Sequence, residues 1–549
     1  MKFNNSLKFF LLVIALIFSN SHLTAGTYYV DCNHPSASDL NPGTQSLPWL
    51  TIQHAAETLV AGDTVFIREG TYYEQVFTTQ DGNLNDGYIV FSAYQDEVPV
   101  IDGTGVTSGI TGFTVSNGYI KLSGLEIRNW ETGIWMEYAE FIELADCEVH
   151  HCFYGIGLSY GTHDFVLNRV LIHDFDLYGF DATPDGGLDC YNGVLNDCIS
   201  HTGRDPGQNV DGFALGHGTQ QNFVFNRCIT YNVYDGFDIS SANTTLNGCL
   251  AYDCWNGGYK LWQDDVNLIN CIGYGSVGSN VEIDWDNEPG RTTLFNCTFY
   301  NGQTFNVWVE NPGDTLFMYN CILAGGDNIA LGFELPGVSN YHGDYNLFHN
   351  DNPERIITVA YTDEFSLQQV QNGGWTTYSG QDSHSIAVSD AGSIFLDMNI
   401  NDLHLTTGSP AVDAGTGAGA PTNDFDGNPR PSGAAVDIGA YEYQSGTRVG
   451  DNFPNKEPEF TLYQNYPNPF NPVTRIKYSI PPSGISSLNP VQMKVYDVLG
   501  KEIDLLVNEE KPAGTYEVSW DGDKYPTGLY FCQLQSGNFL AVRKMLLIK

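Results

Sequence analysis

A repeated pattern of apolar and polar positions dominates the middle of the chain. Three segments align as Asp-Gly-Phe-Ala (211–214), Asp-Gly-Phe-Asp (235–238) and Gly-Gly-Tyr-Lys (257–260), so the repeat is 24 and then 22 residues long. Alternation of inward apolar and outward polar side chains is typical of a strand with one buried face. A period near 22 residues, with three short strands per repeat, predicts a right-handed parallel β-helix whose coils stack on one another. We therefore expect an all-β solenoid.

The last position of each repeat defines a column of side chains along the predicted solenoid. In chain order this column contains Trp135, Gly157, Asp181, Ala214, Asp238, Lys260, Glu282, Trp308 and Ala330. An apolar residue precedes nearly every member and should face the core, so the column faces outward. Lys260 should then project outward between Asp238 and Glu282, with neighbouring coils about 4.8 Å apart. Asp211 and Asp235 should stack in the adjacent column.

Cysteines recur about once per repeat, each after a strand of alternating apolar residues. These are Cys147, Cys198, Cys228, Cys249, Cys271, Cys297 and Cys321. Because free cysteine is among the most buried residue types, this placement favours an inward ladder of small apolar side chains. Twelve cysteines in an exported chain are also compatible with disulfides. Cys152 and Cys254, each five residues after a ladder cysteine, are the candidates for an exception.

The N-terminal part of the chain carries an export signal and a cap. Residues 1–25 contain two lysines, an apolar run and a small residue at the end, which predicts a secretory signal peptide. No other stretch has the length of an apolar membrane span. Residues 26–105 lead into the solenoid, and helical spacing over 51–59 predicts a short amphipathic helix that covers the open end of the first coil.

Beyond the cap, the pattern changes twice. The coils run without a break over residues 106–335, and residues 336–446 form a closing segment with a weaker period. In this segment Asp424, Asp426 and Asp437 either cap turns, which aspartate does often, or bind a structural cation.

A polar linker over residues 447–459 precedes a tail with a different composition. Residues 460–549 hold seven of the twelve lysines of the chain. Alternating strands separated by closely spaced turn signals predict a small C-terminal β-sandwich.

The net charge limits the possible partners. The chain of 549 residues has 59 glycines and a formal net charge of −42, as expected for a turn-rich β protein. This charge argues against nucleic acid and against an anionic membrane as partners. A polyanionic substrate would also be repelled, unless the site supplies its own positive charge. Nothing in the composition demands an oligomer, and we expect a monomer.

Lys260 is the single lysine between Lys121 and Lys456, and it lies among acidic residues on the regular face of the solenoid. An amine that is buried or placed beside a cation has a lowered pKa and can act as a base near neutral pH. The alternative is an ordinary ion pair with Asp238 or Glu282. That pairing would raise the pKa of Lys260 and make it a poor base.

Three carboxylates decide between these alternatives. Asp211, Asp235 and Asp238 fall within two coils, where they repel one another unless a hard cation lies among them. Oxygen ligands from flexible loops suit Ca²⁺, and no histidine or cysteine spacing of a zinc site is present. The sequence favours a calcium site over a solvated row of aspartates, and a bound cation would lower the pKa of Lys260.

In these motifs the chain resembles the family 9 polysaccharide lyases over roughly residues 27–335. The resemblance implies that Asp211, Asp235 and Asp238 are calcium ligands and that Lys260 is the Brønsted base of a β-elimination on pectate or a related acidic polysaccharide. Where that family has paired aspartates, this chain has Tyr234 before Asp235, so Asn209, Asp205 or water would complete the calcium site.

Two further segments carry resemblances. The segment YYVDCNHPSASDLNPGTQSLPWLTIQHA resembles the N-terminal cap of secreted β-helix enzymes that degrade polysaccharides. The tail, with LYQNYPNPFNPVTRIKYSIP and MLLIK, resembles the C-terminal sorting domain of the type IX secretion system. This resemblance implies that the secretion machinery is a partner and that the protein is secreted or held at the outer-membrane surface.

Other residues are weaker candidates for the site. Trp262 and Tyr259, with Trp255 and Trp285, could stack on sugar rings, and Arg204, His217 and Arg291 could contact substrate carboxylates.

Three rival functions remain open. The segment around Asp181 is similar to the site of β-helix mannuronan C5-epimerases but lacks the histidine that follows there. Glu282, Asp284 and Asp286 could form the carboxylate set of a glycoside hydrolase. A solenoid that binds glycan without catalysis has the same fold.

Overall fold

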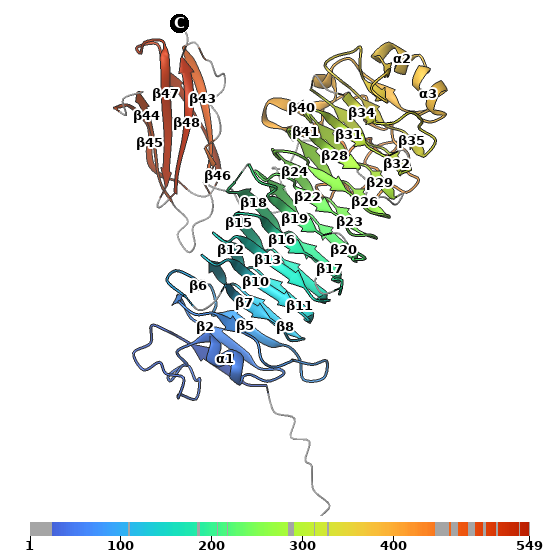
Figure 1. Cartoon of the computed structure of the whole chain (residues 1–549). Helices are drawn as coiled ribbons and strands as arrows, with labels where there is room; N and C mark the ends of the chain where they lie inside the picture. The colour runs from blue at the N-terminus through green and yellow to red at the C-terminus, as the bar shows by residue number, and fades with distance from the viewer. Residues whose placement is uncertain are drawn as a thin grey trace, which may run out of the picture. The chain divides into compact units, whose positions relative to one another are not determined.

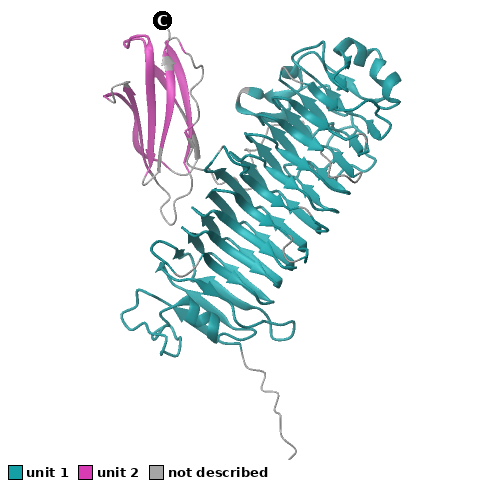
Figure 2. Cartoon of the chain, in the orientation of Figure 1, with its two compact units in different colours: residues 1–446 teal, residues 447–549 magenta. Residues whose placement is uncertain are grey.

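The computed structural model describes residues 25–547, apart from 108–109, 184–186, 206, 217, 284–289, 312, 327–328, 445–460, 463–469, 471, 481–488, 498–500, 512–513 and 537–538. The predicted signal peptide, except Ala25, and most of the linker lie outside the described residues. The chain divides into two compact units, residues 1–446 and 447–549 (Figure 2). The division falls where the sequence predicts the linker to begin.

The first unit is a parallel β-helix (Figure 1), as predicted. Successive coils add strands to three sheets of 13 strands each, and every pairing in them is parallel except that of β37 (Ile357–Val359) with β38 (Asp363–Phe365). Strands begin at Thr27 and continue to Ala387, so the sheets extend beyond the coils predicted over residues 106–335 at both ends.

The strands of each sheet follow in spatial order. Sheet 1 consists of β1 (Thr27–Val30), β2 (Thr64–Ile67), β5 (Ile89–Ala93), β8 (Ile120–Ser123), β11 (Glu140–Ala145), β14 (His163–Asn168), β17 (Tyr191–Asn196), β20 (Gln221–Asn226), β23 (Thr245–Asn247), β26 (Val266–Ile269), β29 (Arg291–Phe295), β32 (Thr315–Tyr319) and β35 (Tyr341–Asp344). Sheet 2 consists of β4 (Val76–Phe77), β7 (Thr111–Val115), β10 (Thr132–Glu137), β13 (Tyr154–Ser159), β16 (Tyr178–Ala182), β19 (Asp211–Leu215), β22 (Phe237–Ile239), β25 (Tyr259–Leu261), β28 (Ser279–Ile283), β31 (Phe305–Val309), β34 (Ile329–Phe333), β37 and β38. Sheet 3 consists of β3 (Gly70–Tyr72), β6 (Pro99–Asp102), β9 (Glu126–Arg128), β12 (Glu148–His150), β15 (Leu171–Phe175), β18 (Ile199–Gly203), β21 (Ile229–Tyr231), β24 (Leu250–Tyr252), β27 (Ile272–Tyr274), β30 (Thr298–Tyr300), β33 (Ile322–Ala324), β36 (Leu347–Phe348) and β39 (Ile386–Ala387).

The entry to the solenoid is capped by the short helix α1 (Ile52–Thr58). The Thr51 side chain accepts a hydrogen bond from His54 N and caps the helix, while Ile52 and Ala55 on one face are buried. The helix therefore covers the end of the core, as its spacing predicts.

Equivalent side chains stack from coil to coil inside the solenoid. The rings of Phe213 and Phe237 lie 5.1 Å apart, and those of Phe237 and Tyr259 lie 5.2 Å apart and nearly parallel. The seven ladder cysteines are buried and free, which confirms the inward ladder. Cys152 and Cys254 are also buried and free, so neither is an exception.

The closing segment covers part of the outer face of sheet 3. Its regular elements are α2 (Leu367–Gln371), α3 (Gly374–Ser379), β40 (Phe395–Asp397), β41 (Asp402–Leu405) and the 3₁₀ turns Ala391–Ser393 and Met398–Ile400. Phe395 and Ile438 pack against Ile272 and Ile322 of sheet 3 in a second apolar core. The apolar outer face of these coils is therefore buried under the closing segment.

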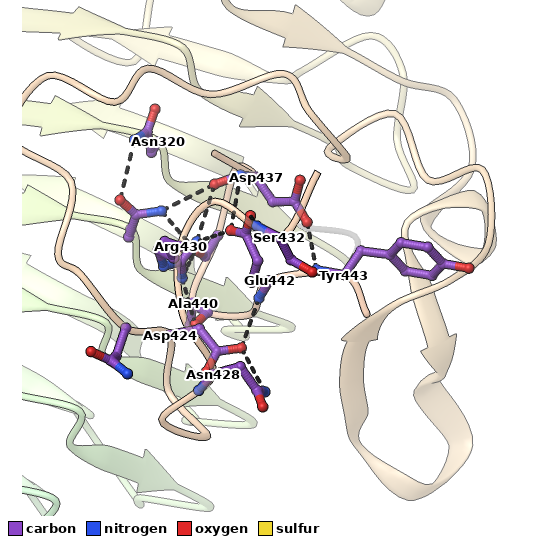
Figure 3. Close-up of polar contacts among 12 residues, drawn as sticks. Asn320, Asp424, Asn428, Arg430, Ser432, Asp437, Ala440, Glu442 and Tyr443 are labelled. Carbon is purple, nitrogen blue, oxygen red and sulfur yellow. Dashed lines mark hydrogen bonds and ion pairs between the residues drawn. The ribbon is translucent and has the colours of Figure 1, made fainter. Parts of the chain in front are cut away.

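A buried ion pair holds the closing segment together (Figure 3). Arg430 Nη1 lies 2.9 Å from Glu442 Oε2, and the two side chains are at most 1% exposed. Arg430 also donates to the carbonyls of Gly439 and Ala440, so the charges are shielded by further hydrogen bonds, as a buried pair requires.

The three aspartates of this segment have structural partners. Asp424 accepts from the backbone of Asn428 and Glu442, and Asp437 accepts from the backbone of Asp413 and Tyr443. Asp426 bonds to His404. Asp424 and Asp437 thus accept from backbone amides, as the turn-capping alternative predicts, whereas Asp426 contacts a histidine side chain.

The second unit is an antiparallel β-sandwich, as predicted. One sheet contains β42 (Thr461–Leu462), β43 (Val473–Ile480) and β46 (Gly514–Asp521). The other contains β45 (Glu502–Lys511), β44 (Asn489–Asp497), β47 (Gly528–Ser536) and β48 (Phe539–Leu547). Trp520, Ile476 and Leu534 lie in its separate core.

Candidate functional site

The register of sheet 2 places Lys260 in an outward column. Asp238 pairs with Lys260 and Lys260 pairs with Glu282 in successive strands, so the predicted order of these three residues is confirmed. The column ends differently from the prediction, because Trp308 pairs with Gly332 and not with Ala330. The coil from Trp308 to Gly332 is two residues longer than the predicted step from Trp308 to Ala330, which shifts the register by two residues.

Lys260 forms an ion pair with Asp235. Its Nζ lies 3.3 Å from Asp235 Oδ2, and the two side chains are 16% and 0% exposed. Asp235 Oδ1 accepts from Asn256 Nδ2 at 2.9 Å and from Gly257 N at 2.8 Å, whereas Oδ2 accepts no hydrogen bond. The partner of the lysine is thus neither Asp238 nor Glu282, the two partners considered from the sequence.

Asp211 lies in the neighbouring column directly beside Asp235, as predicted. Its Oδ1 accepts from Asp235 N at 3.3 Å and its Oδ2 accepts from Asn209 Nδ2 at 3.0 Å. The residue is 1% exposed. Burial raises the pKa of Asp211 well above its usual value, and the charges of Asp235 and Asp238 raise it further.

Asp238 and Trp262 complete the cluster around the lysine. Trp262 Nε1 donates to Asp238 Oδ1 at 2.6 Å, and Lys260 Nζ lies 4.9 Å from the centroid of the Trp262 ring. Trp262 therefore contacts both the amine and one carboxylate, and its predicted contact with sugar stays a prediction.

Two opposing effects act on the pKa of Lys260. Burial lowers it, but the charges of Asp235, Asp238 and Glu282 together outweigh burial, so the pKa is raised. The ammonium form thus predominates while the carboxylates around it carry full charge. An additional cation among those carboxylates is the change that would release the amine as a base.

The carboxylate oxygens of this cluster are the type of donor atom that binds hard cations. Among the described residues, no three acidic, histidine or cysteine side chains already surround one point as in a preformed metal cluster. Nevertheless, Asp211 and Asp235 are adjacent buried carboxylates, and of the two only Asp235 forms an ion pair with Lys260. Oxygen donors with an excess of buried negative charge fit Ca²⁺.

The remaining candidates fall outside this cluster. Arg204 pairs with Asp176 at 2.5 Å and Arg291 pairs with Asp265 at 2.8 Å. In the described part of the chain, neither arginine forms an ion pair with Asp211, Asp235 or Asp238. His217, Trp285, Asp284 and Asp286 lie outside the described residues.

The prediction that Tyr259 binds substrate is wrong. The side chain is 0% exposed, and its hydroxyl donates to the carbonyls of Cys249 and Ile272. Because the residue precedes Lys260 in a strand, it faces the core and continues the inward stack of aromatic rings.

Two asparagines also hold the buried aspartates: Asn209, predicted only as a further calcium ligand, and Asn256, which was not predicted. Each donates its side-chain amide to one of the buried aspartates. Their recurrence just before the aspartate and lysine segments was the available signal, since an amide donor is what orients a buried carboxylate.

Comparisons with known proteins agree on the two parts of the chain. A family model described as "Pel9A-like, right handed beta helix region" matches residues 28–320, and one described as "Secretion system C-terminal sorting domain" matches residues 464–549. Pectate lyase PEL9 of Emericella nidulans is 25% identical over 326 residues, which cover 55% of this chain and 73% of that protein. The uncharacterized protein YwoF of Bacillus subtilis is 44% identical over 75 residues, 14% of this chain and 16% of that protein.

Matches among solved structures have low identity and TM-scores below 0.5. The structure of pectate lyase Pel9A is 17% identical, with a TM-score of 0.49 over 77% of this chain and 97% of that chain. An alginate lyase from Paenibacillus sp. is 14% identical, with a TM-score of 0.36 over 55% of this chain and 94% of that chain.

Proposed function

The chain belongs to the Pel9A-like right-handed β-helix family, and from this premise we propose that it is a lyase that cleaves a polyuronate by β-elimination. Its fold is that of a pectate-lyase-like β-helix with a C-terminal secretion tail. Pectate or polygalacturonate is the proposed substrate, with Lys260 as the base and calcium as the cofactor.

The sorting domain places the protein outside the cell. A C-terminal domain of this family directs export by the type IX secretion system, so the protein is secreted or displayed at the cell surface. Within the described residues, no helix is both long enough and apolar enough to cross a membrane. An exported enzyme has access to polysaccharides too large to enter a cell.

The observation that carries the proposal is the position of Lys260. Its amine lies on the outer wall of sheet 2, 16% exposed, 3.3 Å from Asp235 and in the column of Asp238 and Glu282. A base has to reach a proton on a bound polymer, and only an outward side chain does so.

In the proposed reaction, Lys260 is the base and neighbouring residues hold the site in place. Lys260 removes the proton at C5 of the uronate, and the electron pair of that C–H bond forms a C4–C5 double bond. The C4–O bond breaks, and its oxygen takes a proton from water to become the new hydroxyl end of the polymer. Asn256 and Gly257 N hold Asp235 in place beside the amine.

Calcium would be held by Asp211, Asp235 and Asp238. Its positive charge would neutralise the uronate carboxylate. The same charge would offset the carboxylates that raise the pKa of Lys260. The local positive charge also answers how a chain with a net charge of −42 accepts a polyanion.

The test is the ultraviolet absorbance of the unsaturated product formed from polygalacturonate, with alginate as a second polyuronate. We expect Lys260→Ala to lower the rate at least about 10³-fold, as the loss of a general base does. Chelator should abolish the absorbance and added Ca²⁺ should restore it.

Lys121→Ala is the matched control, because Lys121 also forms an ion pair on the solenoid, with Glu143 at 2.8 Å, but lies in sheet 1. This variant should keep the wild-type rate. Cleavage without new absorbance would instead indicate a hydrolase, and exchange of the C5 proton without cleavage an epimerase. Full activity of Lys260→Ala would refute the proposed base.

A further inference from the structure

Two tryptophans lie in the outward column of sheet 2, on either side of the charged cluster. Trp135 pairs with Gly157 in the next coil, and Trp308 pairs with Gly332. Both glycines lie under an indole ring: a Cβ at Gly157 would be 2.4 Å from Trp135 Cζ3, and one at Gly332 would be 2.6 Å from Trp308 Cε3. Neither ring could lie flat against its sheet if the glycine carried a side chain.

The two rings differ in what covers their outer side. Trp308 is 5% exposed, stacks on Phe305 at 4.2 Å and meets Tyr361 at 5.2 Å, so protein covers it. Trp135 is partly exposed and has no aromatic partner among the described residues. Its one polar contact is from Nε1 to Glu137 Oε2 at 3.4 Å. One face of Trp135 rests on Gly157, and part of the side chain is exposed to solvent.

Glycine is needed at position 157 because of the indole ring of Trp135 and not because of the backbone conformation. Its φ angle is not in the positive range that favours glycine, so an alanine would fit the strand conformation. The absent side chain is needed only because the indole of Trp135 occupies that space. The glycine at position 157 therefore makes room for the indole ring and not for a special backbone conformation.

A second aromatic pair lies at the end of the same two strands. Tyr138 and Tyr160 stack at 5.0 Å with an interplanar angle of 12°, and Tyr138 is 61% exposed. Their φ angles are +54° and +50°, a conformation that is sterically costly for side chains of this size. Burial does not offset this cost at Tyr138. Positive φ angles of 50° to 66° recur at many turns of this solenoid, so the exposed stack of the two rings, and not the backbone, is the feature of this pair.

Resting on the proposed function, we propose that Trp135, with Tyr138 and Tyr160, forms a sugar-stacking subsite for a distal part of the same polyuronate chain. Trp135 lies five strands from Lys260 in one column of sheet 2, about 24 Å along the solenoid axis. The polymer would run parallel to this axis, from the aromatic subsite to the amine.

Stacking suits this position electrostatically. The aromatic face binds the apolar C–H face of a pyranose ring, so the contact needs no positive charge on an acidic protein. Polyuronate carboxylates at the ring edge remain in solvent. The subsite would thus favour long chains over short ones without contributing to the chemistry.

The experiment compares long and short substrates on the intact protein. With polygalacturonate, Trp135→Ala should raise KM about five- to tenfold and leave kcat unchanged. With a trimer, which occupies only the coils beside Lys260, KM should not change. Gly157→Ala keeps the indole but displaces it, and should reproduce the effect on the long polymer.

Tyr73→Ala is the control, because Tyr73 is 62% exposed but follows β3 in sheet 3. It should leave both KM values unchanged. Equal KM for wild type and Trp135→Ala on the polymer, or equal increases on polymer and trimer, would overturn the subsite.

Binding to the Lys260→Ala variant separates this inference from the proposed function. Titration calorimetry with polygalacturonate and with alginate should show binding by Lys260→Ala that the added Trp135→Ala weakens about five- to tenfold. Failure of the wild type to bind or cleave either polyuronate would refute the proposed function and the subsite with it. Cleavage by the wild type with unchanged binding in the double variant would refute the subsite alone.

Discussion

At the scale of single residues, Asp211 shows that burying several carboxylates close together costs folding free energy. Asp235 has the ammonium group of Lys260 as a partner, whereas Asp211 is 1% exposed and is bonded to amide donors alone. Burial and two neighbouring carboxylates raise its pKa well above the usual value. Without a cation, the ionised form of Asp211 therefore destabilises the folded state.

Asp211→Asn should separate this cost from the proposed role in calcium binding. In chelator at neutral pH, the variant should be more stable than the wild type by about 1 kcal/mol, because the amide removes a buried charge. Added Ca²⁺ should raise the melting temperature of the wild type but not of the variant. Thermal unfolding with and without Ca²⁺ measures both effects. Asp96→Asn, at an exposed turn, is the control, and equal stabilisation of Asp211→Asn and wild type by Ca²⁺ would exclude Asp211 as a ligand.

At the scale of elements, the short turn between sheets 1 and 3 contains a residue with positive φ in ten successive coils, from β8–β9 to β35–β36, and this residue changes with its surroundings. The residues with positive φ at this turn are Gly124, Asp146, Arg169, Asp197, Arg227, Gly248, Asn270, Asn296, Asn320 and Tyr345. In the exposed coils they form charged pairs, such as Arg227 with Asp197. Under the closing segment they are asparagines, and Asn296 donates to the carbonyls of Asp437 and Gly439.

Asn296→Ala should therefore loosen the attachment of the closing segment. The substitution removes two buried hydrogen bonds and places alanine at φ +52°. We expect a loss in the free energy of unfolding of about 2–4 kcal/mol, measured in urea. Asn301→Ala has a similar φ of +54° at an exposed position and should cost only about 1 kcal/mol. Equal losses in the two variants would show that the hydrogen bonds contribute nothing.

At the scale of the first unit, the closing segment covers part of the outer face of the solenoid. It is held there by apolar contacts and also by charged groups within the segment. His404 lies between Asp402 Oδ1 at 2.5 Å and Asp426 Oδ2 at 2.8 Å, and stacks on Tyr441 at 3.9 Å. Burial lowers the pKa of His404, but the two carboxylates outweigh it and raise the pKa to about 9.

This shift predicts a pH dependence of stability. The folded pKa of about 9 exceeds the unfolded value near 6.5, so the contribution of His404 is complete below pH 6.5 and is lost as pH rises through 9. The wild type should exceed His404→Gln in stability by up to about 3 kcal/mol more at pH 6 than at pH 10. Urea unfolding at the two pH values measures this difference, and a constant gap between the proteins would contradict the shift.

The repeat pattern alone determined the solenoid, the inward cysteines and the column of Asp238, Lys260 and Glu282. These features follow from two local rules, the alternation of side chains along a strand and the in-register pairing of successive coils. The same rules, applied strictly, would have placed Tyr259 in the core. The register failed only at Ala330, where a longer coil shifted the pairing to Gly332.

Only the tertiary structure decided which carboxylate meets the amine. The choice of Asp235 over Asp238 and Glu282 depends on the lysine rotamer and on the amide donors of Asn256 and Gly257, which no repeat length encodes. It likewise decided that Trp135 remains partly exposed while Trp308 is buried. Contacts between different columns and loops depend on how side chains fill the space between coils, whereas strand periodicity specifies only which face each side chain occupies.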